Sequence, residues 1–276
     1  MANEAFLVGV FYGIVPAMGF LYILLHEYQA YFDEKRVFRT FFIGLIVGLG
    51  TVLLEAALRP LAAEGTHAQA WADAALRAAL FGLLEALVAA MVLNWRTFRG
   101  RRDTPFYAAA FGLGFAAVQT LFLVGGAVRG FGPTVTWGDV YLLSLFGLYF
   151  VGSILVHAAA FVWIGVGTGR GRLPTMVMRA AATLAAYLFL LELALRLDPP
   201  VANLVPLAAV VAAVYLMARV LRGVLDQVVP EEVLREAGIH RRRLARQRLR
   251  EAPDSEHAEP SGAGLEDEAS GDQGRQ

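Results

Sequence analysis

The chain has 276 residues, 57% of them hydrophobic and only 17% charged, with a mean hydropathy of +0.54, which excludes an ordinary soluble domain. Its 24 lysines and arginines balance 24 aspartates and glutamates, so net charge gives no support for nucleic-acid binding. Cysteine is absent, which excludes disulfides, thiolate metal sites and a cysteine nucleophile. The composition predicts an integral membrane protein.

Seven apolar windows follow one another along the chain, separated by charged or Pro/Gly-rich breaks. Each is about 20 residues long, the length that crosses a bilayer as a helix. The residues before the first window contain no lysine or arginine, so we expect a retained helix rather than a signal peptide. We predict an all-α polytopic membrane protein with seven transmembrane helices, approximately Ala5–Leu25, Thr40–Leu58, Ala74–Trp95, Pro105–Val128, Val140–Gly167, Thr175–Leu195 and Asn203–Leu221.

The direction of the spans follows from the distribution of lysine and arginine over the short connections. The first, third and fifth connections, with their flanking helix turns, hold ten cations, whereas the alternate connections hold four. Cytoplasmic loops carry the excess of lysine and arginine, so this alternation places the N-terminus outside and the C-terminus in the cytoplasm. The ten cations are Lys35, Arg36, Arg39, Arg96, Arg99, Arg101, Arg102, Arg170, Arg172 and Arg179, and the four are Arg59, Arg77, Arg129 and Arg196.

After the last span the chain becomes strongly basic. Pro230 followed by two glutamates is a helix-start signal, and six of the ten residues from Arg241 to Arg250 are arginine. We predict a juxtamembrane cytoplasmic helix over residues 223–250. Its arginines attract anionic lipid headgroups, and the candidate contacts are Arg241, Arg242, Arg243 and Arg246.

The last 26 residues are acidic and poor in apolar side chains. Residues 251–276 hold eight acids and one arginine among proline, serine and glycine. Such a segment cannot bury a core, so we predict a disordered tail. The expected organisation is a seven-helix domain over residues 1–222, followed by the basic helix and this tail.

Few ionisable side chains lie inside the predicted spans. They are Glu55, Glu85, His157 and Glu192, with Gln119 as a neutral companion. Because ionisable groups are costly in hydrocarbon, each is a candidate functional residue. At ~1.5 Å of rise per residue, Glu85 and His157 lie ~15 Å and Gln119 ~21 Å from the cytoplasmic ends of their spans. We predict that these three share one layer near the midplane and lie within hydrogen-bond or ligand distance of one another.

The other two acids have partners on their own helices. Glu55 is followed four residues later by Arg59, and Glu192 by Arg196, so we predict a local ion pair at the membrane interface in each case. Glu85 has only apolar residues three and four positions away. It must therefore be neutral or be met by another helix.

Three other kinds of catalytic site find less support. Ser153 precedes His157 by one turn, but without an oxyanion-hole motif this spacing favours a hydroxyl that orients the ring over a serine protease dyad. Asp139 and Asp198 lie at span ends, so no mid-membrane aspartate pair exists. Lys35 is the only lysine and lies in a connection, which leaves no buried amine for a retinal Schiff base.

Four stretches carry a family resemblance. Pro16 precedes a helix end and a charged connection from His26 to Arg39, and Phe41-Phe42-Ile43-Gly44 then opens the next span. The helix of Glu85 comes next in the chain. After it, residues 106–119 read FYAAAFGLGFAAVQ and residues 157–169 read HAAAFVWIGVGTG. Together they resemble the PrsW family of intramembrane metalloproteases, which carries an EExxK motif, a glycine-rich FxxxE helix and a histidine helix in this order.

The resemblance implies a fold, a location and a set of candidate residues. It implies a membrane peptidase of the prokaryotic plasma or inner membrane that uses zinc to activate water. His157 and Glu85 match metal-ligand positions, and Phe115 matches the phenylalanine of FxxxE. Gln119 occupies the position of that motif's catalytic glutamate, and Glu85 keeps only one acid of the expected pair. The sixth and seventh spans contain no histidine, unlike the family's later histidine helix.

One acid and one histidine are fewer than the three protein ligands of a catalytic zinc. We therefore expect the family fold with weakened or lost peptidase activity and a retained role in binding a membrane-embedded partner, such as a single-span protein. The alternative is an active zinc-dependent protease that cleaves a membrane-anchored protein. A transporter is a third possibility, disfavoured by the odd number of spans and the lack of an internal repeat.

Overall fold

A computed structural model describes residues 2–28, 31–58, 67–131, 147–196 and 201–231 of the chain. All regular elements in these ranges are helices, as predicted. The chain divides into two units, residues 1–234 and 235–276. The predicted arginine-rich segment with Arg241, Arg242, Arg243 and Arg246 and the acidic tail lie outside the described residues. The helices are α1 (Ala2–Tyr28), α2 (Glu34–Leu58), α3 (His67–Leu93), α4 (Thr104–Phe131), the π-turn η3 (Leu148–Gly152), α6 (Ser153–Arg170), α7 (Leu173–Arg196), α8 (Val201–Val220), the π-turn η4 (Leu221–Leu225) and α9 (Asp226–Val228).

Six helices in the described ranges are long and apolar enough to cross a membrane. A shorter apolar stretch, Gly9–Leu24, lies in α1, where the first span was predicted. The helical class is therefore confirmed for this part of the chain, and six of the seven predicted spans correspond to a helix that is long and apolar enough to cross a membrane. The six stretches are Glu34–Leu58, Trp71–Leu93, Thr104–Phe122, Phe150–Arg170, Leu173–Leu193 and Leu207–Leu225.

Several helix ends differ from the predicted span ends because local caps, rather than hydropathy, determine them. Helix α2 begins six residues before Thr40, where Asp33 Oδ1 accepts a hydrogen bond from the Arg36 N–H at 3.3 Å. Helix α6 continues to Arg170 and ends at Gly171, whose φ of +69° lies in the left-handed region that favours glycine. The predicted start of this span at Val140 lies outside the described residues.

The last helix continues past Gly223, where the sequence predicted a change of character. Through η4 and α9 it runs to Val228, and the extended conformation of Val229 (φ −79°, ψ 131°) then ends it. A residue before proline is pushed away from helical conformation, so Pro230 explains this end. At the same point the Tyr31 hydroxyl donates a hydrogen bond to the Val228 carbonyl at 2.9 Å, which joins the first connection to the final turn.

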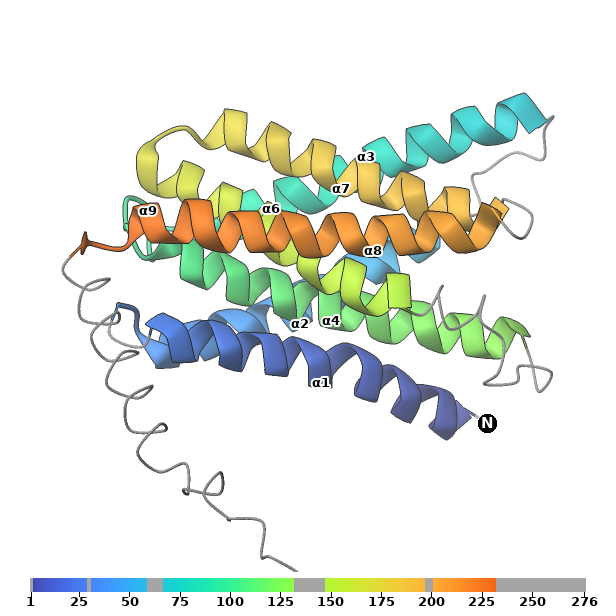
Figure 1. The fold of residues 1–276 in the computed structure, drawn as a ribbon, viewed down its shortest axis with the longest axis horizontal. Helices are drawn as coiled ribbons and strands as arrows, with labels where there is room; N and C mark the ends of the chain where they lie inside the picture. Colours follow the sequence, from blue (N-terminus) through green and yellow to red (C-terminus); the bar gives the residue numbers. More distant parts are fainter. Residues whose placement is uncertain (1, 29–30, 59–66, 132–146, 197–200, 232–276) are drawn as a thin grey trace, which may run out of the picture. The chain divides into compact units, whose positions relative to one another are not determined.

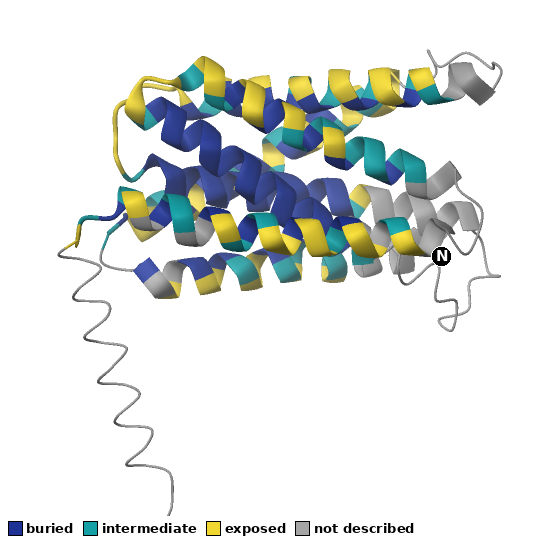
Figure 2. Ribbon diagram, turned by 45° about the horizontal axis from the view of Figure 1, so that its top comes forward, coloured by how far each residue is buried: buried dark blue, intermediate teal, exposed yellow. Residues whose placement is uncertain are grey.

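Helices α4 and α6 form the interior of the first unit, and the other long helices surround them (Figures 1 and 2). In α4 and α6, 89% and 94% of the apolar stretch is buried, against 22% to 39% in α2, α3, α7 and α8. Helices α1 and α2 pack on α4, α3 packs mainly on α7, and α8 packs on α6 and α7. Among the described helices, α4 and α6 are therefore the two whose apolar stretches are largely shielded by other helices.

Glycines allow the close contacts of α4 with its neighbours. A Cβ atom at Gly112 would lie 2.7 Å from the His157 carbonyl oxygen of α6, and one at Gly114 would clash with the Phe41 carbonyl oxygen of α2. From the other side, a Cβ at Gly48 would lie 2.6 Å from the Phe115 carbonyl oxygen. Small residues at such crossings increase the van der Waals contact that drives helix association in membranes.

Candidate functional site

The three polar residues predicted to share a layer lie in contact, each from a different helix. Glu85 comes from α3, Gln119 from α4 and His157 from α6, with exposed fractions of 0%, 4% and 0%. The Gln119 side-chain amide donates a hydrogen bond to Glu85 Oε1, and His157 Nε2 lies 3.1 Å from Glu85 Oε2. The predicted convergence of these residues is confirmed. We call this set the midplane cluster.

The backbone of α6 determines which nitrogen of His157 carries a proton. His157 Nδ1 lies 2.7 Å from the Ser153 carbonyl oxygen, which can only accept a hydrogen bond, so Nδ1 is protonated. The Ser153 hydroxyl, predicted to orient the ring, is farther from Nδ1, at 3.4 Å. Nδ1 therefore donates to the carbonyl group and does not act as a base towards the serine hydroxyl.

One proton remains to be shared between His157 Nε2 and Glu85. Either Nε2 donates to a carboxylate, or a protonated carboxyl group donates to Nε2, and the contact at 3.1 Å satisfies both groups in each case. In the first arrangement a positive imidazolium faces a negative carboxylate, and in the second both groups are uncharged. The pair is therefore neutral overall in both. A neutral, hydrogen-bonded pair avoids the large cost of an isolated charge in a medium of low dielectric constant.

Aromatic side chains enclose the imidazole ring. Phe115 of α4 and Phe161 of α6 lie with ring centroids 5.5 Å and 5.8 Å from that of His157, and Tyr187 of α7 lies at 6.4 Å. Sequence reasoning assigned no site role to Phe161 or Tyr187. The position of Phe161 one turn after His157 could have indicated it, whereas no local signal points to Tyr187.

The residues of the midplane cluster do not fit a catalytic zinc ion. A catalytic site needs three protein ligands and an open position for water, and carboxylates and imidazoles are the ligands available without cysteine. In the described part of the chain no third histidine or acid joins Glu85 and His157. The Gln119 amide nitrogen is directed at Glu85 as a donor, and all three side chains are buried. The zinc roles predicted for His157 and Glu85, and the catalytic role predicted for Gln119, therefore find no complete ligand set here.

Of the two acids predicted near the outer ends of their spans, Glu192 has a partner on another helix. Glu192 Oε2 lies 3.9 Å from Arg77 Nη2 of α3, a contact between helices that sequence spacing does not indicate. Arg59, the predicted partner of Glu55, lies outside the described residues, and the side chain of Arg196 is not described. The two predicted pairs within single helices stay predictions.

A second polar network, missed by sequence reasoning, surrounds the start of α4. The Tyr107 hydroxyl donates to Asp103 Oδ2 at 2.7 Å and accepts from the Asp33 N–H at 3.3 Å. Arg101 donates two hydrogen bonds to the Asp103 carboxylate, at 2.9 Å and 2.7 Å. Burial raises the pKa of Asp103, but the hydrogen bonds from Arg101 and Tyr107 outweigh burial and leave the pKa below its ordinary value.

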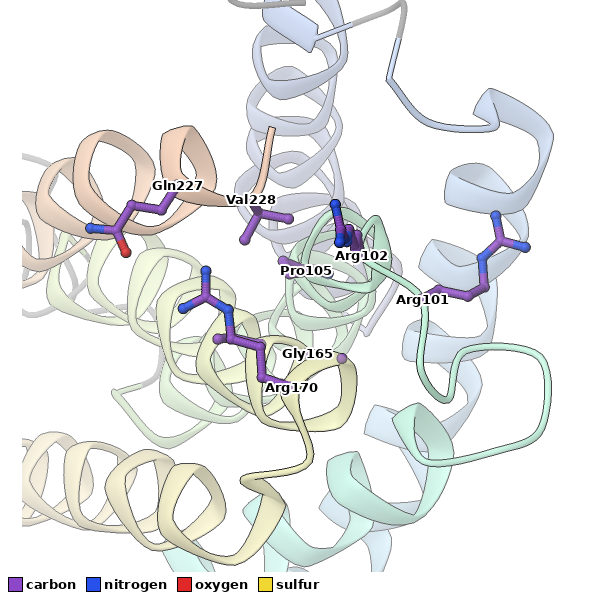
Figure 3. Close-up of a pocket in the computed structure, with 9 residues that line it drawn as sticks. Arg101, Arg102, Pro105, Gly165, Arg170, Gln227 and Val228 are labelled. Atoms are coloured by element: carbon purple, nitrogen blue, oxygen red, sulfur yellow. The ribbon is translucent and has the colours of Figure 1, made fainter. Parts of the chain in front are cut away.

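Next to this network is a cavity of about 400 Å³ at the ends of α4, α6 and α9. Figure 3 shows Arg102, Arg170 and Gln227 around it, with the guanidinium group of Arg101 extended to the far side of the backbone, away from Arg170. The bidentate pair between Arg101 and Asp103 accounts for that orientation. The charge of Arg101 is therefore paired with that of Asp103, and the cavity has less positive charge than a count of its lining arginines indicates.

Comparisons of the chain with models of protein families, with curated proteins and with solved structures gave no match. The resemblance to the PrsW family therefore depends on the four sequence stretches alone and stays a prediction.

Proposed function

We propose that this protein is a non-catalytic, multi-pass membrane protein with a PrsW-like scaffold that binds a membrane-embedded partner. In this proposal α1 is a seventh span, the N-terminus lies outside and the C-terminus lies in the cytoplasm of a prokaryotic cell. The alternation of ten and four cations supports this direction, and the six long apolar helices support the location in a bilayer.

The observation that carries the proposal is the closed hydrogen bonding of the midplane cluster. Both oxygens of Glu85 and both ring nitrogens of His157 have partners, and none of these side chains is more than 4% exposed. A peptidase centre needs water, a base and space for a peptide at the reacting atoms. A network that satisfies its own members instead fixes α3 against α4 and α6, which suits a scaffold.

Metal analysis of the purified protein tests the non-catalytic assignment. We expect less than stoichiometric zinc in wild type after equilibration with zinc and washing, and the same content in Glu85→Gln and His157→Ala. Glu192→Gln is the matched control, because it removes a carboxylate outside the cluster. One tightly held zinc in wild type that disappears in Glu85→Gln and persists in Glu192→Gln would overturn the proposal.

Partner binding requires an exposed surface within the bilayer, and α8 offers one. It is buried along Ala209, Ala213 and Met217, and its other side exposes Leu207 and Val211, each at 60%. Single-span helices bind such surfaces through close packing rather than through a hydrophobic driving force, because lipid is equally apolar. The partner of this proposal is therefore a transmembrane segment with a complementary shape.

A photoreactive residue introduced at Val211 tests this surface in native membranes. We expect a crosslinked single-span protein from Val211 and none from Ala213, which is 2% exposed and is the matched buried control. Recovery of lipid adducts alone from Val211 would contradict partner binding on α8. The same photoreactive residue is introduced at Ile46 on α2, which is 71% exposed. A protein adduct that forms at Val211 and not at Ile46 is specific to α8.

The second candidate function is an active zinc-dependent intramembrane protease, favoured by one observation. His157 Nδ1 donates to a backbone carbonyl, which is the arrangement that holds a metal-binding histidine with Nε2 directed at the ion. In that case Glu85 and His157 would be the ligands. Cleavage of a membrane-anchored substrate, lost in Glu85→Ala and His157→Ala, would support this function.

A further inference from the structure

A cavity of about 630 Å³ opens between the start of α2 and the end of α3, away from the midplane cluster. These helices are consecutive in the chain, but α2 packs on α4 and α3 packs on α7, so they diverge. The cavity is lined at one end by charged side chains and along the remainder mainly by apolar ones. This two-part lining is what an amphiphilic ligand requires.

The lining follows from the spacing of residues on α2. Arg36, Thr40, Ile43 and Val47 recur at intervals of three and four residues, so they share one face of the helix. From Arg36 to Val47 this face extends ~16 Å along the helix axis. From the opposite side, Val92 of α3 adds an apolar side chain to the lining.

The polar end of the cavity carries more positive than negative charge. Lys35, Arg36 and Arg39 contribute three cations, and Asp33 contributes one carboxylate, which already accepts a hydrogen bond from the Arg36 N–H. Trp95, which is 68% exposed, also lines the cavity. Tryptophan is enriched at the level of lipid headgroups, so this end fits the membrane interface.

Arg36 lines the cavity and carries one donor atom without a partner among the described residues. Its guanidinium carbon lies 5.6 Å from the centroid of the Tyr107 ring, a cation–π contact that holds the group in place. Its Nη1 atom is buried and has no hydrogen-bond partner among the described residues. A buried donor without a partner is unfavourable. The side chain as a whole is partly exposed and lines the cavity, so a turn of the guanidinium group that brings Nη1 to the cavity would give this donor a phosphate oxygen as its acceptor.

We propose that this cavity binds one anionic glycerophospholipid. The phosphate contacts Arg36 together with Lys35 and Arg39, and one acyl chain lies along Ile43, Val47 and Val92. The assignment uses the proposed orientation, which places this end of the protein at the cytoplasmic leaflet, where anionic lipids are concentrated. It does not depend on whether the midplane cluster binds zinc.

Lipid selectivity of the full-length protein tests the proposal. The protein is reconstituted in nanodiscs with equal amounts of phosphatidylglycerol and phosphatidylcholine of identical acyl chains, and the retained lipids are counted by native mass spectrometry. We expect wild type to retain one phosphatidylglycerol molecule in preference to phosphatidylcholine. Removal of one cation, in Arg36→Gln, lowers this preference by about fivefold.

Two further variants separate the headgroup from the acyl chain. Lys35 and Arg39 are exposed, so the double variant Lys35→Gln/Arg39→Gln keeps the fold and also loses selectivity. Val47→Trp fills the apolar part and lowers retention of both lipids. The matched control is Arg99→Gln, an exposed cation outside the lining, which keeps the wild-type selectivity and accounts for any lipid attracted to other arginines.

The outcomes that contradict the proposal are equally specific. Equal retention of the two lipids by wild type, or an unchanged preference in both Arg36→Gln and the double variant, would overturn it. Displacement of the retained lipid by millimolar inorganic phosphate alone would mean that the cavity binds free phosphate rather than a lipid. Zinc content is measured on the same samples, so failure here is distinguishable from failure of the proposed function.

Discussion

Helices α4 and α6 differ from α2 and α8 in what surrounds them, and their interior position does not follow from how apolar they are. The apolar stretch of α4 has a mean hydropathy of 1.3 and is 89% buried, whereas that of α2 has 2.2 and is 22% buried. In a bilayer an outer helix exposes leucine and isoleucine to lipid without penalty, so hydropathy does not identify the interior. Six of the nine buried polar residues in the described part of the chain lie on the two inner helices, three on α4 and three on α6.

The largest expected effect follows from adding a methyl group to an inner helix. Gly112→Ala places a Cβ atom 2.7 Å from the His157 carbonyl oxygen and 2.9 Å from Ala158 Cα, both backbone atoms of α6. We expect a loss of about 3 kcal/mol in the free energy of unfolding in lipid–detergent micelles. Gly50→Ala on the outer helix α2, where nothing lies within 4 Å, is the control and costs nothing measurable. Equal stability of the two variants would remove the distinction between inner and outer helices.

The next effect concerns the midplane cluster. In Glu85→Ala the Gln119 amide loses its acceptor and His157 Nε2 loses its only hydrogen-bond partner among the described residues. We expect a loss of about 2 kcal/mol in the free energy of unfolding. Glu85→Gln restores both contacts, because its amide can donate to Nε2 and its oxygen can accept from Gln119, and costs less than ~1 kcal/mol. A Gln variant as unstable as the Ala variant would show that the carboxylate itself is required.

A smaller effect appears only at acidic pH, at the start of α4. The pKa of Asp103 is lower in the folded protein than the ~3.9 of an unfolded chain. As the pH falls, Asp103 therefore takes up a proton in the unfolded state before it does so in the folded state. The stability that Asp103 contributes is fully present above its unfolded pKa. It is lost as the pH falls through its folded pKa. The melting temperature should fall as the pH is lowered from 7 to 3, and this fall should be smaller in Asp103→Asn. Tyr107→Phe removes one hydrogen bond to Asp103 and keeps both from Arg101, so it should reduce the fall in melting temperature by a smaller amount.

The smallest effect is expected on the outer surface. Ile46→Ala on α2 removes apolar atoms from a side chain that is 71% exposed, and in a bilayer lipid replaces them. We expect a change below ~0.5 kcal/mol in the free energy of unfolding. Leu113→Ala on α4, at 0% exposure, is the matched comparison and should cost about 3 kcal/mol, because it leaves a cavity among packed helices.

Much of the architecture could be predicted from the sequence, since span length and charge asymmetry depend on local composition. The helical class and the convergence of Glu85, Gln119 and His157 follow from this information, because ionisable groups at one depth must turn towards one another. Helix ends were less predictable. The cap at Asp33 extends α2, and only Pro230, not the change in composition at Gly223, ends the last helix.

Contacts between helices distant in the sequence could not be predicted. The partner of Glu192 on α3, the ring of Tyr187 beside His157, and the Tyr107–Asp103–Arg101 network depend on which helices become neighbours. No alternation between apolar and polar faces specifies these neighbours in a bilayer, where both faces are apolar. Likewise, nothing local to Gly112 and Gly114 specifies that one packs against α6 and the other against α2.

The central position of α4 has a consequence for biosynthesis. Helices α1 and α2 precede it in the chain, and both pack on it through glycines, Gly13 against the Ala117 carbonyl group and Gly48 against that of Phe115. Between the end of α2 at Leu58 and the start of α4 at Thr104, a ribosome that adds ~5–20 residues per second needs about 2–9 s. In the proposed seven-span topology, the first two helices reside in the bilayer during that interval without their common partner. Insertion of α4 is therefore the step at which α1 and α2 gain the helix they pack on, whereas α3 gains its main neighbour only with α7.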